Sequence, residues 1–195
     1  MMDLNGKTLI LSSTSQSKKK ILSDMDIIFS VEPKTRFLEK YDQSTPHEQI
    51  PVLMAEGKSE GFHRELERNE ILLTADTMVF VDDKAIGKPH HHEEAYEMLR
   101  SLSGKKHKVI TAVTLRDRKG KVTFTDTSFV YFNDLSDEEI KYYVDKYKPF
   151  DKAGAYGIQE WIGYIGISRI EGSFTNIMGL PAAKTYQELK KFVNR

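Results

Sequence analysis

The stretch LLTADTMVFVDDKAIGKP, residues 72–89, sets the organisation of the whole chain. An apolar run stops at Ala75-Asp76-Thr77, and a second apolar run, residues 78–81, follows at once. A turn at Asp82-Asp83 then leads through a short run to Gly87-Lys88-Pro89. This pattern predicts two short strands that are interrupted around Asp76, followed by a hairpin that returns the chain.

Asp76 is a lone carboxylate between apolar strand residues. Burying such a group is costly unless a cation or a polar ligand lies close to it. Asp76 therefore needs a metal ion, a lysine or a polar ligand nearby. Lys88 is one candidate, because the predicted hairpin turns the chain back toward Asp76. The alternative interpretation is structural: Asp76 ends a strand and caps a turn.

The composition is that of an ordinary globular protein, with 195 residues of which 39% are hydrophobic and 30% charged. Lys plus Arg equals Asp plus Glu, 29 each, so no global basic field attracts nucleic acid or an anionic membrane. The absence of cysteine excludes a disulfide framework, a thiolate nucleophile and a Cys-ligated zinc site. No apolar stretch has the length of a signal peptide core or a membrane span, so we expect a cytoplasmic protein.

A hydroxyl-rich loop, residues 12–17, follows the first predicted strand and leads into a helix that starts with Lys18-Lys19-Lys20. The unpaired N–H groups and the positive dipole end of a helix start bind anions. Cations are unfavourable in a first helical turn unless an anion is bound, and three lysines stand there. The pattern therefore predicts an anion site, and the alternative is a solvated basic helix face with serine caps.

The remaining patterns alternate between strand and helix signals, with a hairpin signature at residues 117–120. The predicted strands cover residues 8–11, 27–31, 108–115, 121–132 and 162–170; the predicted helices cover residues 51–66 and 93–102, one that opens with the capping box Ser136 to Glu139, and one that starts at Pro181. Residues 34–46 and 172–181 are predicted to be loops. Together these elements predict one α/β domain, residues 1–195, with a mixed sheet.

Three further groups of residues have side chains suited to binding or catalysis. Lys58 lies in the predicted helix 51–66, near the side that packs, where an ordinary exposed lysine is the simplest interpretation. His90-His91-His92 cannot all face one ion on a regular element, so the run does not favour a metal site. Residues 149–160, PFDKAGAYGIQE, gather glycines and polar groups; the glycines allow a ligand close to the backbone, and Gln159 offers a donor and an acceptor for a base edge.

Taken together, these stretches resemble the Maf family of nucleoside-triphosphate pyrophosphatases along nearly the whole chain. The matching stretches keep the family's order; they are the serine-rich loop, the Ala55/Lys58 helix, Ala75-Asp76-Thr77, Gly87-Lys88-Pro89, Leu102-Ser103-Gly104, residues 151–159, and Gly172-Ser173 through Asn176 to Gly179-Leu180-Pro181. Residues 151–159 resemble the branch that hydrolyses dTTP and UTP rather than the branch that acts on 7-methyl-GTP.

The resemblance implies a Maf/inosine-triphosphatase-like fold, an elongated twisted mixed sheet with flanking helices and two lobes around a deep cleft. It also implies hydrolysis between the α- and β-phosphates to a monophosphate and pyrophosphate, with Mg²⁺ or Mn²⁺, in a protein that is often a homodimer. Asp76 matches the family's proton acceptor and is a candidate metal ligand. The substrate-binding positions implied in the same way are Ser13, Ser15, Ser17, Lys18, Lys58, Thr77, Lys88 and Gln159, with Thr77 and Gln159 at positions associated with base selection.

The chain departs from the family in two places. The family loop continues Ser-x-Ser-Pro-Arg-Arg, whereas this chain has Ser13-Thr14-Ser15-Gln16-Ser17-Lys18. A serine cannot replace a planar bidentate cation, and a lysine offers only a point charge. The family's acidic motif Asp-x-Asp-Glu has no counterpart at residues 34–37, and Glu39 is the nearest carboxylate.

Three hypotheses follow. The first is an active pyrimidine-nucleotide pyrophosphatase that serves in housecleaning of nucleotide pools. This hypothesis is based on the presence of Asp76, Lys58, Lys88 and Gln159. The second is a catalytically weakened nucleotide-binding regulator linked to cell division, because the serine loop is altered. The third, which the match of residues 156–159 disfavours, is an inosine or xanthosine triphosphatase. Nucleotide binding without turnover would favour the second, and a preference for deaminated purines would favour the third.

Overall fold

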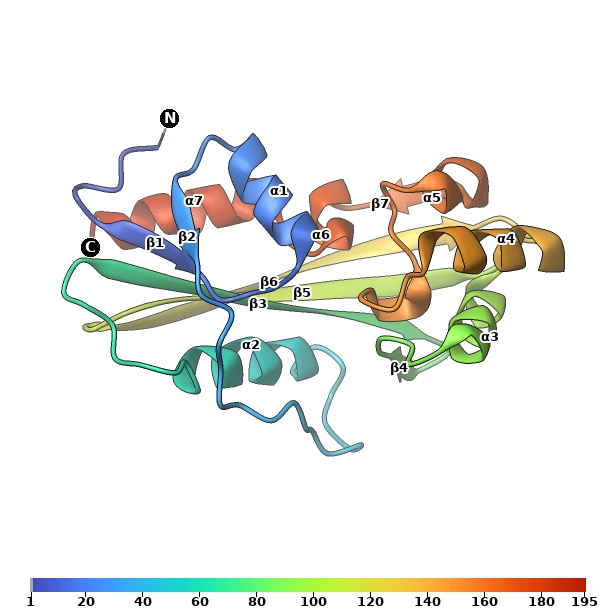
Figure 1. Cartoon of the computed structure of the whole chain (residues 1–195), viewed down its shortest axis with the longest axis horizontal. Coiled ribbons are helices and arrows are strands. Elements are labelled where there is room, and N and C mark those ends of the chain that lie inside the picture. Colours follow the sequence, from blue (N-terminus) through green and yellow to red (C-terminus); the bar gives the residue numbers. More distant parts are fainter. Residues whose placement is uncertain (1) are drawn as a thin grey trace. The chain divides into compact units, whose positions relative to one another are not determined.

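The structure, a computed structural model, describes residues 2–195 and has the predicted α/β class (Figure 1). The described strands form a seven-stranded mixed sheet in the order β2-β1-β3-β5-β6-β7, with β4 paired to β3. The strands are β1 (Thr8–Leu11), β2 (Phe29–Val31), β3 (Glu70–Val81), β4 (Lys84–Ile86), β5 (Lys106–Asp117), β6 (Gly120–Phe132) and β7 (Ile167–Glu171). The helices are α1 (Gln16–Asp24), α2 (Ile50–Glu60), α3 (His92–Leu102), α4 (Asp137–Tyr147), the 3₁₀ turn η1 (Ala153–Ala155), α5 (Trp161–Gly166), α6 (Phe174–Met178) and α7 (Ala182–Val193).

The chain divides into two compact units. Unit 1 contains the chain up to Asp76 together with Thr111–Asp126 and Gly179–Arg195, and unit 2 contains Thr77–Ile110 and Thr127–Met178. The expected single domain with two lobes around a cleft stays a prediction. Among the described helices, none combines the length and the apolar composition needed to cross a membrane.

Unit 1 is built around β1, which pairs in parallel with β2 on one side and with β3 on the other. Leu9, Ile10 and Leu11 lie opposite Ile71–Leu73 of β3, and all six side chains are buried. Helices α1 and α7 lie over one face of these strands and α2 over the other (Figure 1). Cover on both faces explains why β1 and the start of β3 are continuous apolar runs rather than alternating ones.

Strand β3 corrects the prediction for the central stretch. It is one continuous strand that runs through Asp76, so Asp76 neither interrupts nor ends a strand. Its polar side chains are tolerated because α2 supplies partners: the Thr74 hydroxyl donates to the carbonyl of Ala55 at 2.7 Å. Thr74 and Asp76 point to the same face of the sheet, since side chains alternate along a strand. The predicted turn at Asp82-Asp83 is confirmed, with both residues at positive φ between β3 and β4.

Helix α2 ends at Glu60, six residues before the predicted end at Leu66. The reason is Gly61, where the chain meets another segment: a Cβ there would lie 2.8 Å from the backbone nitrogen of Phe37. After Gly61, Phe62 bridges to Thr35 and packs in the core, so residues 61–66 do not continue the helix. The sequence pattern missed this because Phe62 and Leu66 continue the apolar spacing of the helix.

The predicted strand over residues 162–170 is also wrong in its first half. Residues 161–166 form helix α5, and only Ile167–Glu171 form the strand β7. A short apolar run does not distinguish a buried strand from a short helix. Gly163 permits the helix, because a Cβ there would lie 1.8 Å from the carbonyl oxygen of Ile158. The predicted loop 172–181 also contains a short helix, α6.

Unit 2 has its own apolar core, formed by α3, α4 and the strand segments of this unit. A buried imidazole, His107, lies inside it, 2.7 Å from the hydroxyl of Tyr156 and stacked on Phe132. Burial lowers the pKa of His107 from 6.5 to about 4. The imidazole is therefore neutral in the folded protein at pH values where the unfolded chain would protonate it.

This shift predicts acid destabilisation between pH 6.5 and about 4. In this window the unfolded chain binds a proton at His107 and the folded chain does not, so stability is complete above pH 6.5 and falls toward pH 4. The expected loss is about 3 kcal/mol of the free energy of unfolding, measured by urea unfolding at a series of pH values. His107→Phe should remove this component of the pH dependence, whereas the exposed His90→Gln should keep it; equal slopes in all three proteins would contradict the assignment.

Candidate active site

The first component of the site is the place where the strand order reverses. From β1 the chain passes through α1 to β2 on one side, and it then returns through α2 to β3 on the other side. In parallel sheets, ligands bind beyond the carboxyl ends of the strands at such a reversal. The N–H of Ser12 donates to the carbonyl of Leu73 at 2.9 Å, so the serine loop begins beside β3 where β3 continues toward Asp76.

The serine loop is shaped by its own hydroxyl groups. The Ser13 Oγ accepts from the N–H of Ser15 at 3.2 Å, and Ser15 caps α1 by accepting from the N–H of Lys18 at 3.4 Å. Helix α1 begins at Gln16, two residues before the predicted start at Lys18, so Ser17 lies in its first turn and Lys18 is nearly buried. Lys20 lies apart from this group, because it pairs with Asp24 at 2.9 Å. The loop presents hydroxyl groups and a helix start together, which suits an anion.

The second component is a charge cluster on the α2 side of β3. Lys58 Nζ lies 2.5 Å from Asp76 Oδ1 and 2.9 Å from Glu39 Oε1. The side chains of Lys58 and Asp76 are only 15% and 12% exposed, whereas Glu39 is 57% exposed. The predicted need of Asp76 for a cation is confirmed. The cation is Lys58 rather than Lys88.

The charge state of Lys58 follows from its surroundings. Burial by itself lowers the pKa of an amine, but the negative charges of Asp76 and Glu39 and the hydrogen bonds to them outweigh burial here. The pKa of Lys58 is therefore raised, and its ammonium stays protonated near neutral pH. A partly buried ammonium with two carboxylates supplies positive charge and proton-accepting oxygens within a few ångströms.

Helix α2 is fixed on the sheet by polar contacts on either side of Lys58. Arg116 of β5 donates from Nε to the Ser59 hydroxyl at 3.0 Å and from its terminal nitrogen to the Ser59 carbonyl at 2.6 Å. Glu56 accepts from Lys121 at 2.8 Å and from Thr123 at 2.7 Å. These contacts leave the Lys58 backbone little freedom.

Glu39 reaches Lys58 through a close contact in the preceding loop. The ring of Phe37 lies against Gly57, where a Cβ would fall 2.2 Å from a ring carbon. This contact brings Glu39, two residues later, over Lys58. The sequence offered a signal for this contact, since Gly57 and Gly61 form a small-residue face on the predicted helix 51–66 and an aromatic residue lies near Glu39. It gave no signal for the Lys58–Asp76 pair itself.

Three predicted site residues belong to unit 2. Thr77 is its first residue on β3, Lys88 is exposed after β4, and Gln159 lies in the segment 151–160. The segments that carry Lys88 and Gln159 are joined, because the N–H of Gly154 donates to the carbonyl of Gly87 at 2.9 Å. The structure thus gathers the serine loop, Lys58 and Asp76 in unit 1, and Lys88 with Gln159 on linked segments of unit 2.

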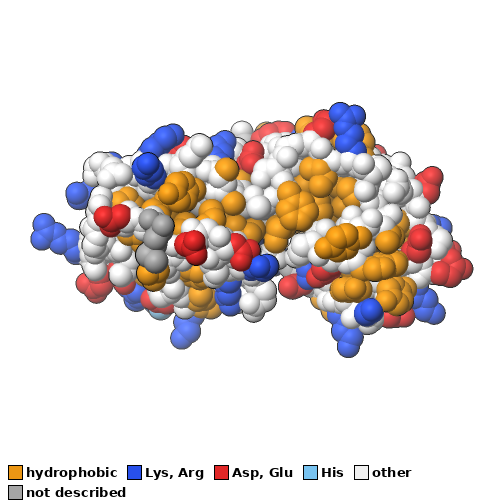
Figure 2. All heavy atoms as spheres, turned by 90° about the horizontal axis from the view of Figure 1, so that it is seen from above, with side chains coloured by type: hydrophobic (Ala, Val, Ile, Leu, Met, Phe, Trp, Pro, Cys, Tyr) orange, Lys and Arg blue, Asp and Glu red, His pale blue; other side chains and the backbone are white. Residues whose placement is uncertain are grey.

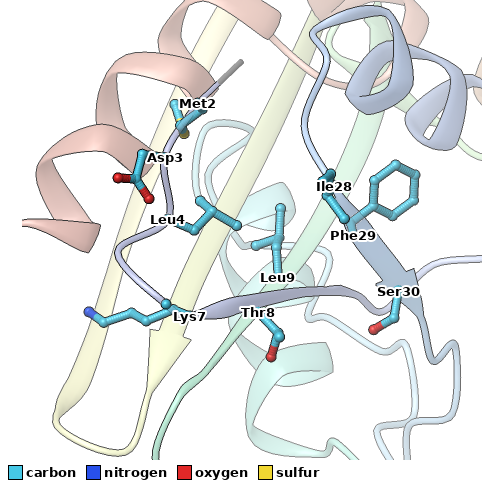
Figure 3. Close-up of a pocket in the computed structure, with 10 residues that line it drawn as sticks. Met2, Asp3, Leu4, Lys7, Thr8, Leu9, Ile28, Phe29 and Ser30 are labelled. Atoms are coloured by element: carbon cyan, nitrogen blue, oxygen red, sulfur yellow. The ribbon is translucent and has the colours of Figure 1, made fainter.

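A cavity of about 670 Å³ lies in unit 1 at the other end of β1 (Figure 3). Leu4, Leu9 and Ile28 are among the residues that line it. Its one lysine, Lys7, donates to the carbonyl of Val193 at 3.2 Å. We place the site at the carboxyl end of β1 and not in this cavity, because the loop, the helix start and the charge cluster are the groups suited to anion chemistry.

The fold and the cluster together define an α/β protein with a hydroxyl-rich loop that leads into a helix start, and a lysine–carboxylate centre, at the reversal of its sheet order. The chain belongs to the Maf family: the family model described as Maf-like protein matches residues 8–192.

Named relatives match this chain over nearly its whole length. A protein of Parabacteroides distasonis named dTTP/UTP pyrophosphatase is 48% identical over 94% of this chain and 95% of its own length. Proteins of the same name from Bacteroides thetaiotaomicron and Porphyromonas gingivalis are 47% and 45% identical; the first alignment covers 97% of this chain and 98% of the relative, and the second covers 94% of each.

Proposed function

We propose that this protein is a nucleoside-triphosphate pyrophosphatase that hydrolyses dTTP and UTP, and related modified pyrimidine nucleotides, to the monophosphate and pyrophosphate. The observation that carries the proposal is the Lys58–Asp76–Glu39 cluster beside the serine loop. Phosphoanhydride hydrolysis needs an oriented water and positive charge around the phosphates rather than a covalent intermediate. The names of the relatives support the reaction and the substrates.

In the proposed reaction, Asp76 accepts a proton from a water molecule that attacks the α-phosphorus. The bond between the α-phosphorus and the oxygen bridging to the β-phosphorus breaks, and its electron pair leaves with pyrophosphate. Oδ1 of Asp76 faces Lys58, so Oδ2 is the oxygen assigned to the proton. Lys58 then offsets the negative charge that develops on the phosphate oxygens.

A divalent cation, Mg²⁺ or Mn²⁺, is part of the proposal. Asp76 and Glu39 are the residues that would hold it, since both carboxylates meet at Lys58. The donor set fits Mg²⁺, which favours one or two carboxylates completed by water and substrate phosphates. When bound, the ion would withdraw charge from the phosphate oxygens.

The remaining roles are assigned by position. Ser13, Ser15, Ser17 and Lys18 are proposed to hold the triphosphate at the start of α1. Lys88 is proposed to neutralise phosphate oxygens, while Thr77 and Gln159 select the base.

We further propose a cytoplasmic homodimer that binds neither nucleic acid nor membranes. The formal net charge of zero supports the absence of binding to nucleic acid and membranes. Figure 2 shows Lys and Arg side chains interspersed with Asp and Glu on the face it displays, rather than gathered in one basic field. Light scattering after size-exclusion chromatography would measure the oligomeric state.

The test of the proposed function is pyrophosphate release from a panel of nucleoside triphosphates, with and without Mg²⁺ or Mn²⁺. Metal-dependent release that is fastest with dTTP and UTP supports the enzyme. Binding of these nucleotides without release would support the regulator instead, an alternative favoured by the altered loop at Gln16 and Ser17. Faster release from inosine or xanthosine triphosphate would overturn the substrate assignment.

Ser17→Arg should raise kcat/KM for dTTP by about tenfold, because a bidentate guanidinium would replace a neutral hydroxyl in the first turn of α1. Steady-state kinetics measure the change, and Ser23→Arg, near the other end of α1, is the matched control. An unchanged or lower kcat/KM would mean that Lys18 already supplies the phosphate contact.

A further inference from the structure

Gln159 lies in a tight turn of unit 2. The N–H of Glu160 donates to the carbonyl of Gly157 at 3.0 Å, which closes a four-residue turn with Ile158 and Gln159 at its centre. Ile158 is buried, so one central residue holds the turn in the core while the next carries the amide side chain. The orientation of Gln159 therefore depends on what fixes the two ends of the turn.

The hydroxyl of one buried tyrosine holds both ends of this turn. The Tyr143 hydroxyl of α4 accepts from the N–H of Gly157 at 3.0 Å and donates to the Glu160 carboxylate. Tyr143 is completely buried in the core of unit 2. Burial, together with the hydrogen bond to Glu160, raises the pKa of Tyr143, so the phenol remains a donor. A single oxygen atom on a rigid helix thus fixes the first and last residues of the turn.

A lysine completes this arrangement. Lys152 Nζ lies 3.2 Å from Glu160 Oε1, the oxygen that Tyr143 does not use. Both side chains are only 20% exposed. Gly157 lies under this ion pair, where a Cβ would fall 2.8 Å from the carboxyl carbon of Glu160 and 3.0 Å from Lys152 Cε. Because of this close packing, the turn has a single backbone position beneath the ion pair.

We infer that Tyr143, Glu160 and Lys152 are positioning residues that hold the Gln159 turn and thereby set the discrimination between nucleotide bases. The inference rests on the proposed function only in taking Gln159 as the base-reading residue. None of the three residues needs to touch the substrate. Their effect is on selectivity, because a looser turn would present the amide of Gln159 in several orientations and lose the preference for one base edge.

The test compares the wild type with Tyr143→Phe, which removes the shared hydroxyl and keeps the ring. Dissociation constants are measured by calorimetry for the non-hydrolysable α,β-methylene analogues of dUTP and dATP. The measure of discrimination is the dissociation constant of the dATP analogue divided by that of the dUTP analogue. We expect this ratio to fall by about tenfold in Tyr143→Phe, because the dUTP analogue binds more weakly. Glu160→Gln, which keeps an acceptor for the phenol but loses the charge facing Lys152, should show a smaller fall and carries the test if Tyr143→Phe does not fold.

Two controls separate positioning from general destabilisation. Tyr142→Phe removes the neighbouring, exposed hydroxyl of α4 and should keep the wild-type ratio. The dissociation constant of ribose 5′-triphosphate, which has no base, should stay within twofold of the wild-type value in every folded variant. A wild-type ratio in folded Tyr143→Phe, or a wild type that does not discriminate between the analogues, would overturn the inference. Since binding needs no turnover, an inactive wild type would refute the proposed hydrolysis and still leave this test decisive.

Discussion

Asp76→Asn should lower the rate of pyrophosphate release from dTTP by about 10³-fold, within the range expected for loss of a general base. The amide keeps the size of the carboxylate and an oxygen facing Lys58, but it cannot accept a proton from water. The fold should persist with a loss of about 1–2 kcal/mol in the free energy of unfolding, because Lys58 keeps Glu39 as a partner. Initial rates and urea unfolding measure the two effects.

Asp82→Asn is the matched control for this substitution. Asp82, on the β3–β4 turn, is also 2.5 Å from a lysine, Lys105, but both side chains of this pair are exposed. Asn tolerates the positive φ of 47° at this residue. Asp82→Asn should therefore retain wild-type turnover. Retained turnover in Asp76→Asn would remove Asp76 from the role of base and leave its ion pair as a structural feature.

Lys58→Met should lower kcat/KM by about 10²-fold or more and also reduce stability. The methionine fills much of the same space, but the Asp76 carboxylate then lies 12% exposed without its cation. Removing one member of a largely buried pair costs about 3 kcal/mol. Kinetics and urea unfolding of the same preparation give both values.

Lys58→Arg and Lys105→Met separate charge from packing. Lys58→Arg keeps the positive charge and should recover much of the stability. It should recover only part of the turnover, because the planar, delocalised guanidinium does not place its charge as the compact ammonium of lysine does. Lys105→Met removes an exposed lysine and should cost well under 1 kcal/mol. If Lys58→Met lost stability but kept full turnover, Lys58 would be structural only.

The sequence predicted most elements of the fold, since local patterns determine them. Strand β1 matches its predicted bounds, α3 begins one residue before its predicted start, and α4 begins directly after Ser136 of its capping box. The failures share a cause. The continuity of β3 through Asp76 depends on partners in α2, and the end of α2 depends on contact with Phe37. Tertiary contacts between distant residues decided both, and no local period encodes them.

For the candidate site, the sequence predicts that Asp76 needs a partner but does not predict the arrangement that supplies one. Asp76 was singled out because an isolated carboxylate in an apolar strand requires a partner, a purely energetic argument. The identity of that partner required the structure, because Lys58 is 18 residues away and has the pattern of an ordinary helical lysine. Tyr143 had no signal at all, since its position in an amphipathic helix accounts for it as a core residue.

The discontinuous course of unit 1 has implications for how the protein is made. Its three segments end with α7, which supplies the buried Leu189 and Phe192. Roughly 120 residues separate Asp76 from Arg195, so at ordinary translation speeds about 6–24 s pass between their synthesis. During that interval β1 and β3 emerge from the ribosome without α7, one of the two helices that cover one face of these strands. Unit 1 can therefore complete its core only after α7 has been translated.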